Sequence, residues 1–235
     1  MDFCSIHVYA DVFVDAKVVA SEITKIFPNC LVDVRPAFKH DHRIELAKIT
    51  DVKQPLEKQP KQTNDMVPLY DGFLVQRIFA EVIPAAERDH VHIILTKLLL
   101  CTFIEDDWRY HARAVVCGTP SIISTTGIVE APAKPREFYF AQLGGLTDVS
   151  SLKKRFAGRF IDYGDDRMTA AATVYALQAL FFFVADGKPF CDDKSCRLYN
   201  AHWQEELIHV IEKEAFCAHH ERIANKFNNN RSVKR

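Results

Sequence analysis

The chain has 235 residues, of which 48% are hydrophobic, and its 30 basic and 31 acidic side chains almost cancel. That length supports one sizeable core or two small ones, and the balanced charge argues against nucleic acid or an anionic membrane as a partner. No apolar segment free of charge reaches the eighteen or more residues that a membrane span requires. The N-terminus carries acids and no basic region of the signal-peptide type.

Cysteine usage points to a reducing, cytoplasmic location, because the count is seven, an odd number, and no export signal is present. Cysteines that are close in sequence then indicate metal binding rather than disulfides. Cys4, Cys30, Cys101 and Cys117 lie singly in apolar surroundings, and we predict that they are small core residues.

The N-terminal third predicts a sheet with a crossover helix. Residues 5–10 alternate as in a strand, residues 15–27 carry a helical apolar stripe that Asp15 can cap, and residues 31–35 form a second strand. The polar stretch 39–67, with PLEKQPKQTND its most linker-like part, is interpreted as a surface excursion within one domain.

The middle of the chain predicts a helix over 70–82 and short strands over 92–96, 113–117 and 121–124, while 134–142 and 152–160 are ambiguous. From Asp166 a run that is apolar nearly all round predicts a buried helix, which Gly187 and Pro189 end. Residues 202–213 carry one apolar stripe that includes Trp203, as in a surface helix, and the tail 226–235 is predicted to be disordered.

Three cysteines and a histidine pair fall within 30 residues, with the spacing Cys191-x4-Cys196-x20-Cys217-x2-His220. Thiolate and imidazole ligands in a tetrahedral set favour zinc, and four protein ligands make such an ion structural. His219 competes with His220 as the fourth ligand. The alternative is a set of unconnected thiols.

These residues carry a family resemblance. The segment CDDKSCRLYNAHWQEEL followed by FCAHH resembles the structural zinc site of archaemetzincins, with His220 where that family has a fourth cysteine. VVCGTPSIIST is similar to the family's edge-strand region. FIDYGDDR and EAPAKPREFY resemble an uncharacterised archaeal group of metallopeptidase-like proteins. The resemblance runs from about residue 90 onward and implies a metzincin-like fold with one structural zinc.

The chain departs from that family on the buried helix. Archaemetzincins carry His-Glu-x-x-His-x-x-Gly-x-x-His there, with three zinc-binding histidines and a glutamate as general base. The matching helix here contains YALQA, and no histidine or glutamate occurs between Phe138 and Ala201. The resemblance therefore implies the fold and the structural zinc, and argues against peptide hydrolysis by the family mechanism.

Other polar groups offer weaker candidate sites. His90-x-His92 lies on a predicted strand, where alternate residues share a face and could chelate a metal. His40 and His42 are most simply part of a polar loop. In EDDWRYHAR, a rearranged site could use His111 as base or metal ligand beside Glu105 and the neighbouring acids. An anion clamp for a peptide carboxylate could combine Arg113, Lys134 and Arg136. Locally paired ions are the favoured alternative for these groups.

Together these observations predict an α/β (α+β) fold with a mixed β-sheet and packing helices. Residues 1–225 would form one metallopeptidase-like domain, with a zinc-binding segment at 187–222. The leading hypothesis is a metallopeptidase homologue with one structural zinc, non-catalytic or catalytically altered, that binds a peptide or protein ligand. The alternatives are an active hydrolase with a rearranged site around His111, and a pure protein-interaction module that uses the Trp203 helix or the 39–67 loop.

Overall fold

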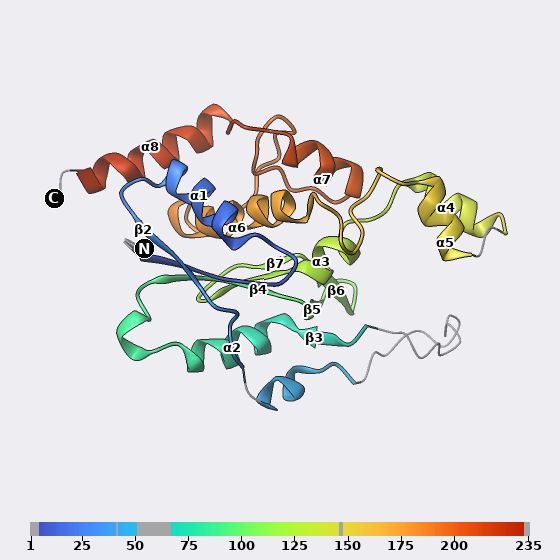
Figure 1. Cartoon of the computed structure of the whole chain (residues 1–235), viewed down its shortest axis with the longest axis horizontal. Coiled ribbons are helices and arrows are strands. Elements are labelled where there is room, and N and C mark those ends of the chain that lie inside the picture. The colour runs from blue at the N-terminus through green and yellow to red at the C-terminus, as the bar shows by residue number, and fades with distance from the viewer. Residues whose placement is uncertain (1–4, 41, 51–66, 146–147, 233–235) are drawn as a thin grey trace.

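The computed structural model describes residues 5–40, 42–50, 67–145 and 148–232. A five-stranded sheet forms the middle layer of the molecule (Figure 1). Its strands, from one edge to the other, are β2 (Leu31–Arg35), β1 (Ser5–Tyr9), β4 (Val91–Thr96), β8 (Ser121–Ser124) and β7 (Val115–Val116). The first four are parallel and β7 is antiparallel, so the sheet is mixed, and VVCGTPSIIST does supply an edge strand.

Helices cover both faces of this sheet (Figure 1). On one face lie α1 (Ala16–Ile26), α6 (Met168–Val184), α7 (Gln204–Ile211) and α8 (Ala218–Ser232), and on the other lies α2 (Gly72–Val82). The alternation of β1 sets the two faces, because Ile6 and Val8 pack into the core under α1 and α6 while Tyr9 packs into the core on the α2 side. This arrangement confirms the predicted α/β class.

The predicted strand–helix–strand opening is confirmed. Strands β1 and β2 are parallel neighbours in register Ser5 to Leu31, and α1 connects them. Asp15 caps the helix by accepting hydrogen bonds from the backbone N–H groups of Lys17 and Val18. The buried residues Val19 and Ile23 form the core-facing stripe of α1.

A second, three-stranded sheet of β3 (Leu69–Asp71), β5 (Leu99–Ile104) and β6 (Arg109–Arg113) lies beside the first. Strand β5 pairs parallel with β3 and antiparallel with β6. The sequence analysis predicted neither β5 nor most of β6, and its strand over 113–117 covers β7 together with only the last residue of β6. The chain instead passes from the second sheet to the first at Ala114, whose carbonyl accepts from the N–H of Ser124.

The long apolar helix is confirmed as core, since the side chains of Ala171 to Phe181 on α6 are all buried. The ambiguous stretches contribute α4 (Arg136–Leu143) and α5 (Val149–Arg155), which pack around Phe138, Leu152, Phe156 and Phe160. The remaining elements are α3 (Thr125–Glu130) and two 3-10 turns, η1 (His42–Ala47) and η2 (Ala85–Glu87).

The sequence analysis predicted a disordered tail from residue 226, and the described part of that segment belongs to helix α8. Helix α8 continues to Ser232 because its last turns pack against α1. The ring of Phe227 lies edge-on to Phe27, 5.5 Å between centroids, and the Asn228 side-chain amide donates to the Ile26 carbonyl at 2.9 Å. Long-range packing rather than local composition therefore orders this segment.

Some predictions fall outside the described residues, namely those for Cys4, for the PLEKQPKQTND stretch and for the last three residues. Cys30 and Cys101 are buried, as predicted, whereas Cys117 is only partly buried. None of the helices in the described ranges has a run long and apolar enough to cross a bilayer.

Candidate metal centre and adjoining cavity

The structure brings Cys191, Cys196, Cys217 and His220 together, with their ligand atoms all within 4.8 Å of one another. The Sγ atoms of Cys191 and Cys217 lie 3.8 Å apart, and the His220 Nδ1 atom lies 3.8 Å from Cys196 Sγ and 3.2 Å from Cys217 Sγ. Two thiolates about 2.3 Å from one tetrahedral zinc ion would be roughly 3.8 Å apart. The four side chains therefore have the spacing that one ion requires.

A tight loop after α6 positions the first two cysteines. The Cys191 N–H donates to the Leu198 carbonyl at 2.9 Å, and the Cys196 N–H donates to the Asp193 carbonyl at 3.0 Å. The Asp193 carboxylate accepts from the Ser195 N–H and closes the turn. Backbone N–H groups of Asp193 and Leu198 point at the sulfur atoms of Cys191 and Cys196, at 3.4 and 3.5 Å, an arrangement that stabilises thiolates.

The start of α8 positions the other two donors and distinguishes the two adjacent histidines. Cys217 directly precedes the helix, and His220 lies in its first turn with only 5% of its surface exposed. The ring of His220 packs edge-on against Phe181 of α6, 5.5 Å between centroids. His219 is exposed and is not part of the four-residue group, so the geometry places His220 and not His219 beside the thiols.

Burial is the largest single influence on the pKa values of the three cysteine thiols. It raises the pKa of Cys191 to about 12 and also raises the pKa of Cys196. Burial acts on Cys217 in the same direction, but hydrogen bonds from the backbone N–H of His220 and from neighbouring thiols outweigh it and lower the pKa of Cys217. A bound divalent cation would overcome the burial effect by binding the thiolate forms, and ion binding would therefore release protons.

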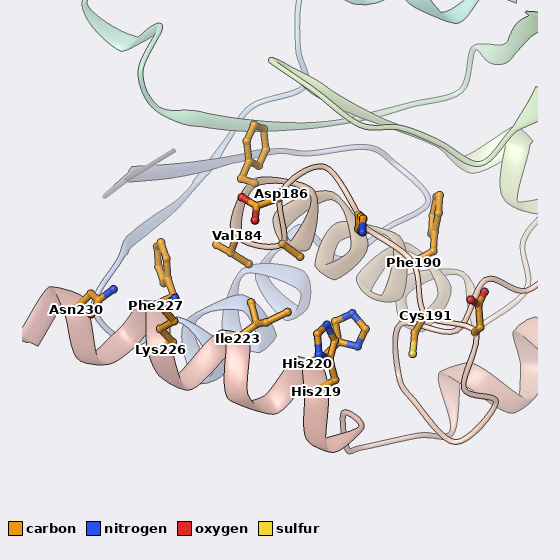
Figure 2. Close-up of a pocket in the computed structure, with 14 residues that line it drawn as sticks. Val184, Asp186, Phe190, Cys191, His219, His220, Ile223, Lys226, Phe227 and Asn230 are labelled. Carbon is orange, nitrogen blue, oxygen red and sulfur yellow. The ribbon is translucent and has the colours of Figure 1, made fainter.

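A cavity of about 700 Å³ adjoins the metal centre (Figure 2). It lies between α8 and the end of α6, and Figure 2 shows Ile223, Phe227 and the two histidines on α8 facing Val184 and Asp186. Cys191 and His220 belong to both the metal centre and the cavity wall. The lining combines apolar side chains with charged groups of both signs, the lysines Lys188 and Lys226 and the aspartates Asp186 and Asp192.

The acidic hairpin site predicted around His111 is only partly assembled. His111 lies on β6, one third exposed, and its Nε2 atom contacts the Asp107 carboxylate at 2.7 Å. Glu105 is exposed in the β5–β6 turn and has no described hydrogen bond to His111. Arg113 donates from Nε to the Thr102 hydroxyl at 2.7 Å. Strand pairing therefore gives His111 one acidic neighbour, Asp107, within hydrogen-bond distance.

The three residues of the predicted anion clamp each have a different neighbour in the described structure. The Arg136 guanidinium on α4 lies over the Trp203 ring, 5.3 Å from its centroid. Lys134 pairs with Glu130 at 3.7 Å, and no hydrogen bond or ion pair links either residue to Arg113. Trp203 is half-buried, and of the other apolar residues in its stripe Leu207 and Val210 are buried while Ile211 is partly buried. The α7 stripe therefore contributes to the core.

A second group of possible metal ligands consists of His7, Glu87 and His92, whose ligand atoms also lie within 4.8 Å of one another. The sequence analysis singled out His90 and His92 on one strand, and it missed His7 and Glu87. The pairing of β1 with β4 places His7 directly opposite His92, 85 positions away in sequence. No local spacing in the sequence signals such a contact.

Of three comparisons with known proteins, the one against sequence models of protein families gave a match. The sequence model of a family described as "Probable metallopeptidase family (DUF6775)" matches residues 2–227. The match thus extends through the N-terminal 90 residues, which the archaemetzincin resemblance did not cover. A search of the curated proteins and a search of the solved structures each found no match. The chain belongs to this probable metallopeptidase family.

Proposed function

We propose that this chain is a metallopeptidase homologue that holds one structural zinc ion, does not hydrolyse peptides through the archaemetzincin motif, and binds a peptide-like ligand beside the zinc site. The observation that carries the proposal is the convergence of Cys191, Cys196, Cys217 and His220. Three thiolates and one imidazole nitrogen suit zinc, and four protein ligands leave no position for a catalytic water.

Helix α6 supports the second part of the proposal. The sole glycine after residue 164 is Gly187, which ends the helix region with a φ of +78°. In a second register, different from the YALQA match, aligning the glycine of His-Glu-x-x-His-x-x-Gly-x-x-His with Gly187 puts the four reactive positions at Leu180, Phe181, Val184 and Phe190. None of these side chains can bind a metal ion or accept a proton. Leu180 and Phe181 are instead fully buried in the core.

The cavity beside the zinc site supports the third part. Its volume, about 700 Å³, lies in the range of small-ligand sites. Phe190, Ile223 and Phe227 offer apolar contacts, and the ammonium groups of Lys188 and Lys226 could pair with a carboxylate. A short peptide with an apolar C-terminal residue combines these two properties.

Metal content of the purified full-length chain tests the proposal. We expect about one zinc ion per chain. His220→Ala should lose most of the zinc and His219→Ala should keep it, because the two residues are adjacent but only His220 faces the thiols. Wild-type protein without zinc, or equal loss in both variants, would overturn the structural-zinc assignment.

The proposed binding of a peptide in the cavity is tested separately, on zinc-loaded protein. Titration with a short peptide library should show binding that Lys226→Ala weakens, whereas Lys213→Ala, away from the cavity lining, leaves it unchanged. Binding of no peptide, or equal effects of both variants, would exclude the cavity as the binding site and leave the zinc assignment intact.

A further inference from the structure

A cluster of ionisable side chains lies on the α2-facing side of the large sheet, separate from the cysteine site. His7 of β1 and His92 of β4 occupy opposite positions in neighbouring parallel strands, and their ring centroids are 5.0 Å apart. Both rings are buried, at 6% and 0% exposure. Two imidazoles inside a core need partners for all four nitrogen atoms, and those partners fix where the protons lie.

The partners of His7 leave its Nε2 atom unprotonated. Its Nδ1 atom contacts the carboxylate of Asp33 on β2, which can only accept, so Nδ1 carries the proton. The Arg35 guanidinium, which can only donate, lies 3.3 Å from Nε2. A carboxylate bound to the outer nitrogen of an imidazole is the arrangement that orients histidine ligands toward metal ions.

The partners of His92 likewise leave its Nδ1 atom unprotonated. Its Nε2 atom lies 2.8 Å from the backbone carbonyl of Glu87, again an acceptor only, so Nε2 carries the proton. Nδ1 then accepts a hydrogen bond from the Tyr9 hydroxyl group at 3.1 Å. Each buried histidine therefore presents one lone pair within the cluster, and each tautomer is held by a group outside the pair.

Two further donors complete the cluster. The Nδ1 atom of His90 lies 2.9 Å from His7 Nε2, close to the roughly 3.0–3.3 Å expected for two nitrogen ligands about 2.0–2.1 Å from one ion. The Glu87 carboxylate lies within 4.8 Å of the ligand atoms of His7 and His92. In the structure Arg35 donates two hydrogen bonds to the Glu87 carboxylate, at 2.7 and 2.9 Å. The Arg35 guanidinium is therefore the positively charged partner of Glu87 when no cation is bound.

We propose that His7, His92 and Glu87, with His90 beside His7, form a second metal site for a borderline divalent cation such as zinc or cobalt. Imidazole and carboxylate donors suit these ions. The cation takes over from Arg35 as the positive partner of Glu87. Because the Asp33 side chain is 54% and the His90 side chain 25% exposed, the cluster reaches solvent. His7, His92 and Glu87 bind the cation directly, and three protein ligands leave a fourth coordination position for His90 or for a small molecule.

Cobalt binding to the zinc-loaded full-length protein tests this proposal. With the cysteine site filled by zinc, a second equivalent of cobalt should bind and give visible d–d absorption without the near-ultraviolet bands of cobalt–thiolate bonds. Metal analysis after gel filtration should then give one zinc and one cobalt per chain. Uptake of no cobalt, or cobalt that appears only with thiolate bands as zinc leaves, would overturn the proposal.

Two variants identify the ligands. His92→Gln should lose the cobalt equivalent and keep the zinc. Asp33→Ala should weaken cobalt binding about 10–100-fold, the usual effect of removing the partner of a histidine ligand. Because Asp33 is largely exposed, that variant is expected to fold even where a change of the buried His92 does not.

The matched control is Glu81→Ala, which removes an acid of similar exposure, 56%, that pairs with Arg43 instead. It should bind cobalt as the wild type does. Equal cobalt affinity in Asp33→Ala and in the wild type would show that the histidine cluster is not the site.

Discussion

At the residue scale, Phe181 connects the buried helix with the metal centre. Its ring packs against Phe27 of the α1 end, against Phe216 just before Cys217, and edge-on against His220, with centroid separations of 5.1 to 6.0 Å. This ring therefore links the core of the buried helix to His220, one of the four candidate metal ligands.

Truncation of this ring is the first prediction. Phe181→Ala should lower the free energy of unfolding by about 3–5 kcal/mol, as expected for a fully buried aromatic residue, and should also weaken zinc retention because His220 loses its support. Phe190→Ala, at 40% exposure, is the control and should cost less than about 1 kcal/mol. Urea unfolding with metal analysis measures both effects. Equal costs for the two variants would contradict this packing role.

The second prediction concerns pH. Hydrogen bonds from Arg35 lower the pKa of Glu87 from its ordinary value of 4.5 to about 2. A carboxyl group whose pKa is lowered on folding stabilises the protein fully above the unfolded value and loses that contribution as the pH falls toward the folded value. Glu87→Gln should therefore be less stable than wild type at pH 7, and the difference should shrink between about pH 4.5 and 2. Unfolding curves at pH 7, 4 and 2.5 measure it, and a constant difference would contradict it.

Some of the site was predictable from single residues and some was not. The spacing of Cys191, Cys196 and Cys217 is local, so the sequence indicated the group that the structure assembles. The choice between His219 and His220 depends on the helical phase of α8, which directs one ring inward and its neighbour outward. The contact of His7 with His92 depends on strand pairing between distant segments, which no spacing rule supplies.

At the element scale, α8 shows how tertiary packing orders a segment of weak intrinsic preference. Its sequence AHHERIANKFNNNRS is polar and rich in asparagine, and composition alone favoured disorder over its second half. Phe227 and Asn228 nevertheless lie against Phe27 and the Ile26 carbonyl at the end of α1. By contrast, α6 was predictable because its sequence is apolar on every side.

The third prediction follows from the packing of Phe227 and Asn228 against the end of α1. Deleting residues 226–235 should lower the free energy of unfolding by roughly 2–4 kcal/mol, because it removes a packed aromatic ring and a hydrogen bond. The control is deletion of 233–235 alone, which leaves Phe227 and Asn228 in place and should change stability little. Urea unfolding distinguishes them. A neutral effect of the longer deletion would support a disordered tail instead.

At the scale of the whole molecule, the metal centre joins the C-terminal segments and lies apart from the central sheet. Its donors come from the loop after α6 and from the start of α8, whereas the sheet packs against α1 and α6 in the large hydrophobic core. The class of fold was predictable from the alternation of strands and helices. The second sheet was not, because the apolar run of β5 fits a strand or a core segment equally well.

The fourth prediction is the effect of metal removal on this architecture. A strong chelator should lower the melting temperature and increase amide hydrogen exchange first in the loop from Cys191 to Tyr199 and in the first turns of α8. The amides of β1 and β4 should stay protected until global unfolding. Hydrogen-exchange mass spectrometry with and without chelator measures both regions. Simultaneous loss of protection in the sheet and the loop would show that the ion is required for the whole fold.

The contact between α1 and α8 also bears on how the chain folds during synthesis. Strand β1, helix α1 and strand β2 contact one another locally, yet in the described part of the chain α1 also contacts α6, Arg197 and α8, which are synthesised about 140 to 200 residues later. Contacts of such high sequence separation form late and slowly. The part of the apolar surface of α1 that these segments cover therefore stays open to chaperones and to neighbouring nascent chains until α8 has been synthesised.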